Sequence, residues 1–434
     1  MISGIRKSLL QFIFSGAYMK RWNDKLRPLE LIEIDKQAHK MITAWLLCRL
    51  KARELTQPEA AALESDVVEG GLFDYLFRLV ITDIKPPILY RIKENPAHYQ
   101  QLAKWATDEV KPHLRPFSPE FWQRFTTHVM QPKPQGLAAE ILDAAHHYAS
   151  VWEFQRLRAL NESFDDEIPD IERSFQEKLV SYQGLPGMPE LIAGLERPLC
   201  RGEEREPASA LSRFANLCGQ LRFQKRWSQT PRVPETSVMG HMFVVGCYAY
   251  FLSYALGACP VRRVNAFFCG LFHDLPELLT RDIISPVKKS VEDLDKLIRE
   301  YEEAELERRI FAPLRRDGLT DVVDRLGYYL GLETGSEFHN TVRVPGDDGI
   351  VGVQRKDYSD FHMRFNKDEC DPKDGDAVKV CDTLAAYIEA YTAIRNGITS
   401  DHIQQAFWRM RETNAKGTLG NSDIHIGALF TDFD

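Results

Sequence analysis

Apolar residues recur at helical spacing in five long stretches of the chain: 36–52, 238–256, 262–273, 294–312 and 378–395. Both halves of the sequence therefore predict helices, and the expected fold class is all-α. The segment 334–376 departs from this pattern. It holds two short apolar runs, 341–344 and 350–353, on either side of a Pro-Gly-Asp-Asp-Gly turn, which predicts a β-hairpin. We expect this segment, rich in Asp and Lys, to lie on the surface as a lid or a partner contact.

The chain also repeats itself, because a set of landmarks occurs twice in the same order and at similar spacing. An Arg-Trp pair is followed by a His, then by a Gly-Leu-Phe helix end, and then by an Asp that opens a further helical stretch. The matched residues are Arg21-Trp22 with Arg226-Trp227, His39 with His241, Asp74-Tyr75 with His273-Asp274, and Asp143 with Asp382. The repeat predicts two tandem units, 1–196 and 209–434. The charged, Pro-containing segment 197–208 is the predicted linker, and the second unit carries an insertion at about 334–376.

Composition narrows the class of protein. A chain of 434 residues with 44% hydrophobic and 27% charged residues is typical of a globular protein with more than one core. No apolar run reaches the roughly 20 residues of a membrane-spanning helix, so no membrane partner is expected. The eight cysteines form no Cys-x-x-Cys pair, which favours a reduced, cytoplasmic setting. The net charge of −8 argues against a protein that coats nucleic acid, whereas a small anionic substrate needs only a few local cations; a homo-oligomer is left open.

The second unit places metal-ligating side chains inside apolar helices. His273 and Asp274 end the apolar stretch 264–272, while His241 and Asp382 each lie in another apolar helix. A carboxylate in such a place is costly unless it is paired or bound to a metal. Two imidazoles and two carboxylates can hold one divalent ion, and this donor set suits Mn²⁺, Co²⁺, Fe²⁺ or Zn²⁺ better than Ca²⁺ or Mg²⁺. A single helical His is more often an ordinary core residue, so the combination of all four predicts the metal centre.

These four residues resemble the His…His-Asp…Asp pattern of the HD superfamily of metal-dependent phosphohydrolases. A longer string is closer to the bacterial HD-domain 5′-deoxynucleotidases of the YfbR type: Arg226-Trp227, then His273-Asp-Leu-Pro-Glu277-Leu-Leu-Thr-Arg-Asp282-Ile-Ile-Ser-Pro-Val-Lys288. The resemblance covers about 211–400 without the insertion. The chain departs from the family at Gly240, where relatives often have Glu, and at Thr236-Ser237, where they often have an acidic-Asn pair. The departures bear on which nucleotide is bound more than on hydrolysis.

The resemblance implies a role for each of these residues. His241, His273, Asp274 and Asp382 would hold the metal, and Glu277 would act with Asp274 in catalysis by positioning or deprotonating the attacking water. Arg226 would hold the phosphate, Trp227 would pack on the sugar and exclude a 2′-hydroxyl, Asp282 would read the 3′-hydroxyl, and Lys288 would add phosphate charge. Glu277 shares a face with His273 only if the helix continues through Pro276. A solvated carboxylate at Glu277 and a surface lysine at Lys288 are the open alternatives.

The first unit is expected to be a degenerate HD-like domain. It has Asp74-Tyr75 where His-Asp belongs and Arg78 where Glu277 stands, so at most His39, Asp74 and Asp143 remain around any ion. His146-His147, beside Asp143, is interpreted as a solvated helical pair.

We therefore expect a cytoplasmic 5′-nucleotidase that hydrolyses deoxynucleoside 5′-monophosphates with one divalent transition-metal ion. Two other readings stay open. One is an HD hydrolase of another phosphoester, such as a deoxynucleoside triphosphate or an oligonucleotide end. The other is a non-catalytic regulatory module that binds nucleotide.

Overall fold

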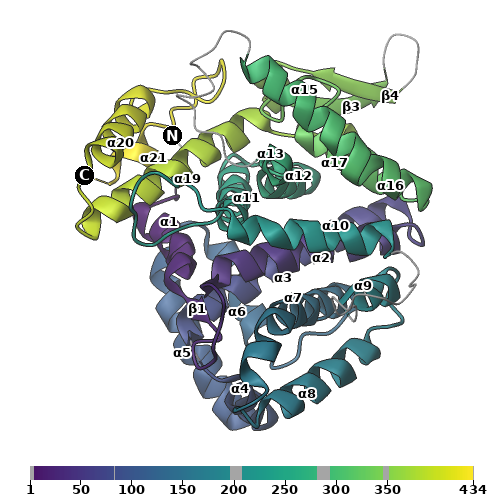
Figure 1. Ribbon diagram of the computed structural model, residues 1–434. Helices are drawn as coiled ribbons and strands as arrows, with labels where there is room; N and C mark the ends of the chain where they lie inside the picture. Colours follow the sequence, from purple (N-terminus) through teal and green to yellow (C-terminus); the bar gives the residue numbers. More distant parts are fainter. Residues whose placement is uncertain (1–3, 83, 196–207, 281–293, 346–350, 434) are drawn as a thin grey trace.

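The computed structural model describes residues 4–82, 84–195, 208–280, 294–345 and 351–433 (Figure 1). The helices of its first half are α1 (Lys7–Phe14), α2 (Glu33–Ala52), α3 (Gln57–Ile81), α4 (Pro86–Glu94), α5 (Pro96–Leu114), α6 (Pro119–Val129), α7 (Leu137–Asn161), α8 (Ile168–Ser181) and α9 (Met188–Leu195). The helices of its second half are α10 (Ala210–Gln220), α11 (Val238–Ala255), α12 (Pro260–Phe272), α13 (Glu277–Thr280), α15 (Leu294–Leu306), α16 (Ala312–Arg316), α17 (Thr320–Leu330), α18 (Tyr358–Arg364), α19 (Gly375–Arg395), α20 (Asp401–Asn414) and α21 (Ala428–Thr431).

Strands form only two antiparallel ribbons in this described part of the chain. β1 (Lys20–Arg21) pairs with β2 (Leu31–Ile32), and β3 (Thr341–Pro345) pairs with β4 (Val351–Arg355). The all-α class is therefore confirmed, and so is the predicted hairpin, whose turn at 346–350 lies outside the described residues.

The apolar stretches become helices with one interruption. The predicted stretches 36–52, 238–256, 262–273 and 378–395 are α2, α11, α12 and α19, but 294–312 is not one regular helix. After α15 ends at Leu306, a π-helical turn spans Glu307–Phe311 before α16 begins. Pro313, in the first turn of α16, has no N–H and its ring collides with the carbonyl four residues earlier, which explains the break.

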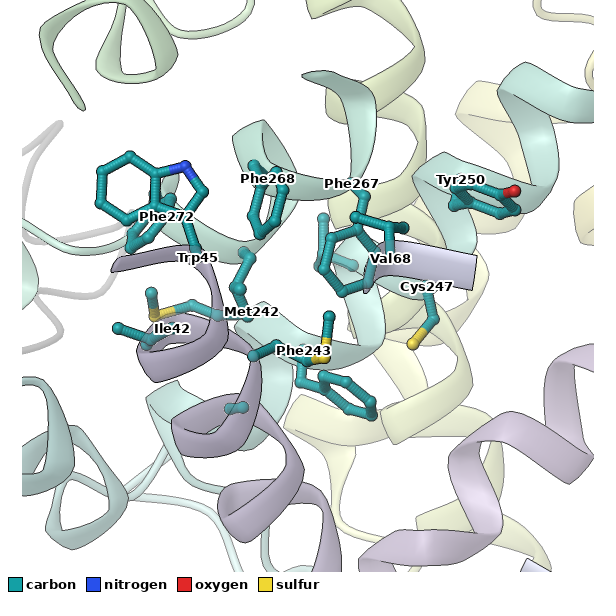
Figure 2. Close-up of a cluster of buried hydrophobic side chains, with 14 of the residues drawn as sticks. Ile42, Trp45, Val68, Met242, Phe243, Cys247, Tyr250, Phe267, Phe268 and Phe272 are labelled. Carbon is teal, nitrogen blue, oxygen red and sulfur yellow. The ribbon is translucent and has the colours of Figure 1, made fainter. Parts of the chain in front are cut away.

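The two halves of the chain share one hydrophobic core. Helices α2 and α3 pack against α11 and α12 (Figures 1 and 2). Trp45 of α2 lies edge-on to Phe272 of α12 with ring centroids 4.9 Å apart, and Tyr75 of α3 lies edge-on to Phe243 of α11 at 4.8 Å. The predicted linker 197–208 falls outside the described residues except at Ala208, so the limits of the two units stay a prediction.

Helix α11 lies at the centre of this core. Its 18 residues are long and apolar enough to cross a membrane by length and composition alone. However, 89% of them are buried inside the fold, against α2, α12 and α19. The apolar composition of α11 is explained by this packing.

The insertion at 334–376 is tied to the core at its base. The buried Arg262 guanidinium of α12 donates from Nε to Asp374 Oδ2 at 3.0 Å, and Arg325 of α17 pairs with Asp371. Val342 of β3 is also buried, whereas Val351 of β4 is exposed. The expectation of a surface segment is therefore right for β4 and wrong for the base, where two buried arginines need carboxylate partners.

The cysteines of the described residues are all free, and most are buried: Cys48, Cys218, Cys247, Cys259, Cys269, Cys370 and Cys381.

Candidate metal centre

Helices α11 and α12 approach each other closely because glycine faces glycine at their crossing. A Cβ atom on Gly270 would lie 2.8 Å from the Gly246 backbone, and one on Gly246 would lie 2.9 Å from the Phe267 carbonyl oxygen. Side chains at this crossing would force the helices apart. The close approach brings His241 and His273 together with ring centroids 5.5 Å apart.

The end of α12 presents two ligand side chains at once. The helix stops at Phe272, and residues 273–276 form a turn that contains Pro276. The His273 Nδ1–H donates to the Gly270 carbonyl at 2.8 Å, which leaves the Nε2 lone pair available. His273 Nε2 is buried and accepts or donates no hydrogen bond within the described part of the chain, as expected of an atom that binds a metal.

The four predicted ligands converge, as the sequence predicted. Asp274 Oδ2 lies 3.2 Å from His273 Nε2 and 3.8 Å from His241 Nε2, while Asp382 Oδ1, from α19, lies 3.0 Å from His241 Nε2 and 3.8 Å from His273 Nε2. Ligand atoms that each bind one ion at about 2.1 Å lie about 3–4 Å from one another. The ligand atoms of His241, His273 and Asp274 all lie within 4.8 Å of one another, which fits a single divalent cation, and they form the group of this kind found among the described residues. Asp382 lies against both imidazoles but falls outside that group.

The electrostatics of the site favour a positive charge between the carboxylates. Burial opposes a charged imidazole, yet Asp274 and Asp382 raise the pKa of His273 well above its usual value. Burial likewise opposes ionisation of Asp382, but the two histidines hold its pKa well below the ordinary range. A divalent cation satisfies the same demand for positive charge while both imidazoles stay neutral.

Glu389, which was not predicted as a site residue, lies beside the candidate metal ligands. This buried carboxylate lies on α19 seven residues after Asp382, two helical turns along the same face. Its Oε1 accepts from the Thr236 hydroxyl at 2.6 Å and lies 3.8 Å from His241 Nδ1. A charged residue at this spacing, in the mainly apolar stretch of α19 that follows Asp382, is the signal that could have identified it.

Glu389 also holds the Arg-Trp pair. The Trp227 indole N–H donates to Glu389 Oε2 at 2.8 Å, and the Arg226 guanidinium lies 3.5 Å from the same oxygen and 3.5 Å from Asp274 Oδ2. Burial opposes the charge on Arg226, but Glu389 and then Asp274 raise its pKa, so Arg226 stays cationic. Arg232 lies behind them, buried against Thr236 with its NH2–Oγ1 distance at 2.7 Å.

The remaining predicted site residues have different outcomes. Glu277 begins the separate helix α13. The helix of His273 does not continue through Pro276, so the condition for a face shared by His273 and Glu277 is not met. Glu277 still lies near the site: its N–H donates to the Asp274 carbonyl at 3.0 Å, and its charge contributes to the raised pKa of Arg226. Asp282 and Lys288 lie outside the described residues.

The residues expected to remain around an ion in the first half do not converge. The His39 Nε2–H donates to the Ala215 carbonyl at 3.0 Å, Asp74 binds Lys40 and His128, and Asp143 accepts from the Tyr182 hydroxyl. His147 is buried against Asp143 and Tyr182, so the interpretation of a solvated histidine pair is wrong.

Comparison with known families agrees with this geometry. Residues 218–411 match the family model of the HD domain. Comparisons with curated proteins and with solved structures found no match. The matched range contains all four ligands together with Arg226, Trp227 and Glu389. The part of the chain that holds the candidate metal centre thus matches the HD domain, a family whose members are in general metal-dependent hydrolases.

Proposed function

We propose that the HD domain is a phosphomonoesterase that releases phosphate from deoxynucleoside 5′-monophosphates. The observation that carries this proposal is the position of Arg226, whose guanidinium lies 3.5 Å from the metal ligand Asp274. A cation beside the ligand set is where the phosphate of a substrate would be held. A divalent ion bound by the four ligands supplies Lewis-acid polarisation of the phosphoryl oxygens and lowers the pKa of bound water.

Arg226 binds and orients the phosphate. Its guanidinium is planar and always charged, so it pairs with two phosphate oxygens at once. The Arg226 guanidinium lies between two carboxylates, 3.5 Å from Glu389 Oε2 and 3.5 Å from Asp274 Oδ2. The arginine is thus fixed before substrate binds, which reduces the entropy lost on binding.

Glu277 is the residue that we assign to accept the proton of the attacking water. Its backbone N–H binds the Asp274 carbonyl, which fixes the first turn of α13 next to the ligand turn. A carboxylate at this place can accept the proton as the water oxygen attacks phosphorus. The bond from phosphorus to the 5′-oxygen breaks on the opposite side, and the departing 5′-oxygen takes up a proton from solvent to give the nucleoside.

Trp227 is the residue that we assign to pack against the sugar of the substrate. Its indole edge is held by Glu389, and the Arg232 guanidinium lies 5.7 Å from the ring centroid. A ring fixed in this way offers a rigid apolar surface to a deoxyribose, and a 2′-hydroxyl placed against it would be desolvated without a partner.

The charges favour a monophosphate over a triphosphate. Among the described residues, Arg226 is the cation that contacts the candidate metal ligand Asp274. Arg232 is buried against Glu389 and Thr236. A triphosphate brings about two more negative charges and would need further cations.

Substrate and product analysis tests this proposal. The protein is assayed with Mn²⁺ and with Co²⁺ on deoxynucleoside and ribonucleoside 5′-monophosphates and on deoxynucleoside triphosphates. Orthophosphate release from deoxynucleoside monophosphates, with ribonucleotides poorer, is expected, and Trp227→Ala should reduce that preference. The proposal is contradicted if the protein releases triphosphate from a deoxynucleoside triphosphate. It is also contradicted if the protein loaded with either metal binds nucleotide but does not hydrolyse it.

A further inference from the structure

The two Arg-Trp pairs are built in the same way. Trp22 and Trp227 have positive backbone φ values of 55° and 56°, a conformation that is rare for a bulky residue. Each indole N–H donates to a fully buried glutamate of a long helix: Trp22 to Glu153 of α7 at 3.0 Å, and Trp227 to Glu389 of α19 at 2.8 Å.

The backbone pairing around each tryptophan also has the same register in the two halves. Lys20 faces Ile32 across β1 and β2, and Lys225 faces Ser237 across an isolated antiparallel bridge. One residue further along, Glu33 begins α2 and Val238 begins α11. The Glu33 N–H donates to the Met19 carbonyl and the Val238 N–H donates to the Gln224 carbonyl, each at 2.9 Å.

This register identifies the counterpart of His241. His241 lies fourteen residues after Trp227, and Lys36 lies fourteen residues after Trp22. The match of His39 with His241, taken from sequence spacing, is therefore displaced by three residues, close to one helical turn.

The paired glutamates identify a second counterpart. Asp382 precedes Glu389 by seven residues, and His146 precedes Glu153 by seven residues on α7. His146, and not Asp143, thus occupies the place of Asp382. The two counterparts contact each other through Lys36 Nζ and His146 Nδ1, as His241 and Asp382 do in the second half.

We propose that the first half contains a metal-free counterpart of the metal centre, in which hydrogen-bond donors fill the places of ligands. Lys36 Nζ lies at hydrogen-bond distance from His146 Nδ1, so this ring nitrogen is occupied by a donor. Lys40 Nζ lies 2.6 Å from Asp74 Oδ2, and His128 Nε2 lies 3.0 Å from Asp74 Oδ1, so both oxygens of that carboxylate are taken as well. Asp74 stands where His273 stands in the second half.

The counterpart has acquired a structural role. Glu153 Oε2 accepts from Trp22 and Arg21, but its Oε1 accepts from Arg222 of the second half at 2.8 Å. Arg222 also donates to His39 Nδ1 at 3.1 Å and lies four residues before Arg226. Glu153 and His39 of the first half thus hold the segment that leads to Arg226.

The test counts the ions bound per chain. It depends on the metal centre of the second half but not on the substrate, so failure of the proposed nucleotidase activity would leave it intact. Chelator-treated full-length protein is loaded with Co²⁺, freed of excess ion, and measured by atomic emission and by the visible absorbance of bound Co²⁺. One ion per chain is expected for the wild-type protein and none for His241→Ala, whereas His39→Ala should keep its ion.

A gain-of-function variant tests the register directly. In the His241→Ala background, Lys36→His and His146→Asp supply an imidazole and a carboxylate, while Lys40→Ala and His128→Ala free both oxygens of Asp74. One ion per chain should then return. Any one of three results overturns the proposal. The wild-type protein binds two ions, His241→Ala retains an ion, or the gain-of-function variant folds but binds no ion. If that variant does not fold, as judged by circular dichroism, the wild-type and His241→Ala counts decide alone.

Discussion

The Asp35 carboxylate of α2 accepts a hydrogen bond of 2.6 Å from the Ser237 hydroxyl, and Ser237 caps the helix that carries His241. The Ser237 Oγ in turn accepts from the Gly240 N–H at 2.9 Å, one residue before the metal ligand. Both side chains are buried. A side chain of the first half therefore fixes the start of α11 and, through it, the position of His241.

Replacement of Asp35 by Ala should destabilise the protein and weaken metal binding. The Ser237 hydroxyl would be left buried without its acceptor, at a cost of about 1–3 kcal/mol in the free energy of unfolding. Asp35→Asn keeps an acceptor oxygen and should lose less. Urea unfolding and Co²⁺ titration of both variants check this, and equal losses in the two would show that the hydrogen bond is unimportant.

Asp35 should also make stability depend on pH. Burial raises its pKa to about 6, although Ser237, Arg222 and Lys225 pull it down. The folded protein then keeps a proton that the unfolded chain releases near pH 4. The stabilisation is complete below about pH 4 and is lost as the pH rises through about 6, by roughly 3 kcal/mol.

The neutral variant Asp35→Asn supplies the matched control for this pH dependence. Its free energy of unfolding, compared with that of the wild-type protein from about pH 4 to about pH 7, should lack this fall. A difference between the two proteins that stays constant over the range contradicts the assignment.

Glu389→Gln should reduce both stability and substrate binding. The variant leaves the buried Arg226 and Arg232 without their carboxylate, which costs about 3–5 kcal/mol of unfolding free energy. Glu153→Gln is the matched control, because it removes the same kind of carboxylate from Arg21 and Arg222. The two should lose similar stability, while the KM for phosphate esters should rise more in Glu389→Gln. A larger KM change in the control would argue against Glu389 as the residue that positions Arg226.

The periodicity of apolar residues was sufficient to predict most of the long helices, and it placed four His and Asp side chains in apolar surroundings. That these four side chains bind a metal stays a prediction. What the sequence could not provide was the packing between the halves. A Cβ atom on Gly240 would lie 2.6 Å from Asp35 Oδ1 and 2.6 Å from Ile34. The departure from the family at Gly240 is therefore explained by the first half, which leaves no space for a side chain.

Register was the second limit of the sequence. His39 and Asp143 resemble ligands by residue type, whereas the true counterparts of His241 and Asp382, Lys36 and His146, have changed type. Residue identity thus favoured the wrong positions by about one turn, and only the backbone pairing after each tryptophan corrected this. Glu389 was missed because its partners lie far away in the sequence.

Metal-dependent phosphate release is the most direct test of the central claim that His241, His273, Asp274 and Asp382 form one working metal centre. Chelator-treated protein is resupplied with Mn²⁺ or Co²⁺, and orthophosphate released from deoxynucleoside 5′-monophosphates is measured together with bound metal for the wild-type protein, Asp274→Ala and Glu277→Ala. We predict that Asp274→Ala loses both metal and activity, and that Glu277→Ala keeps its metal but loses activity at least about 100-fold. Full metal binding and full activity in Asp274→Ala would contradict the account.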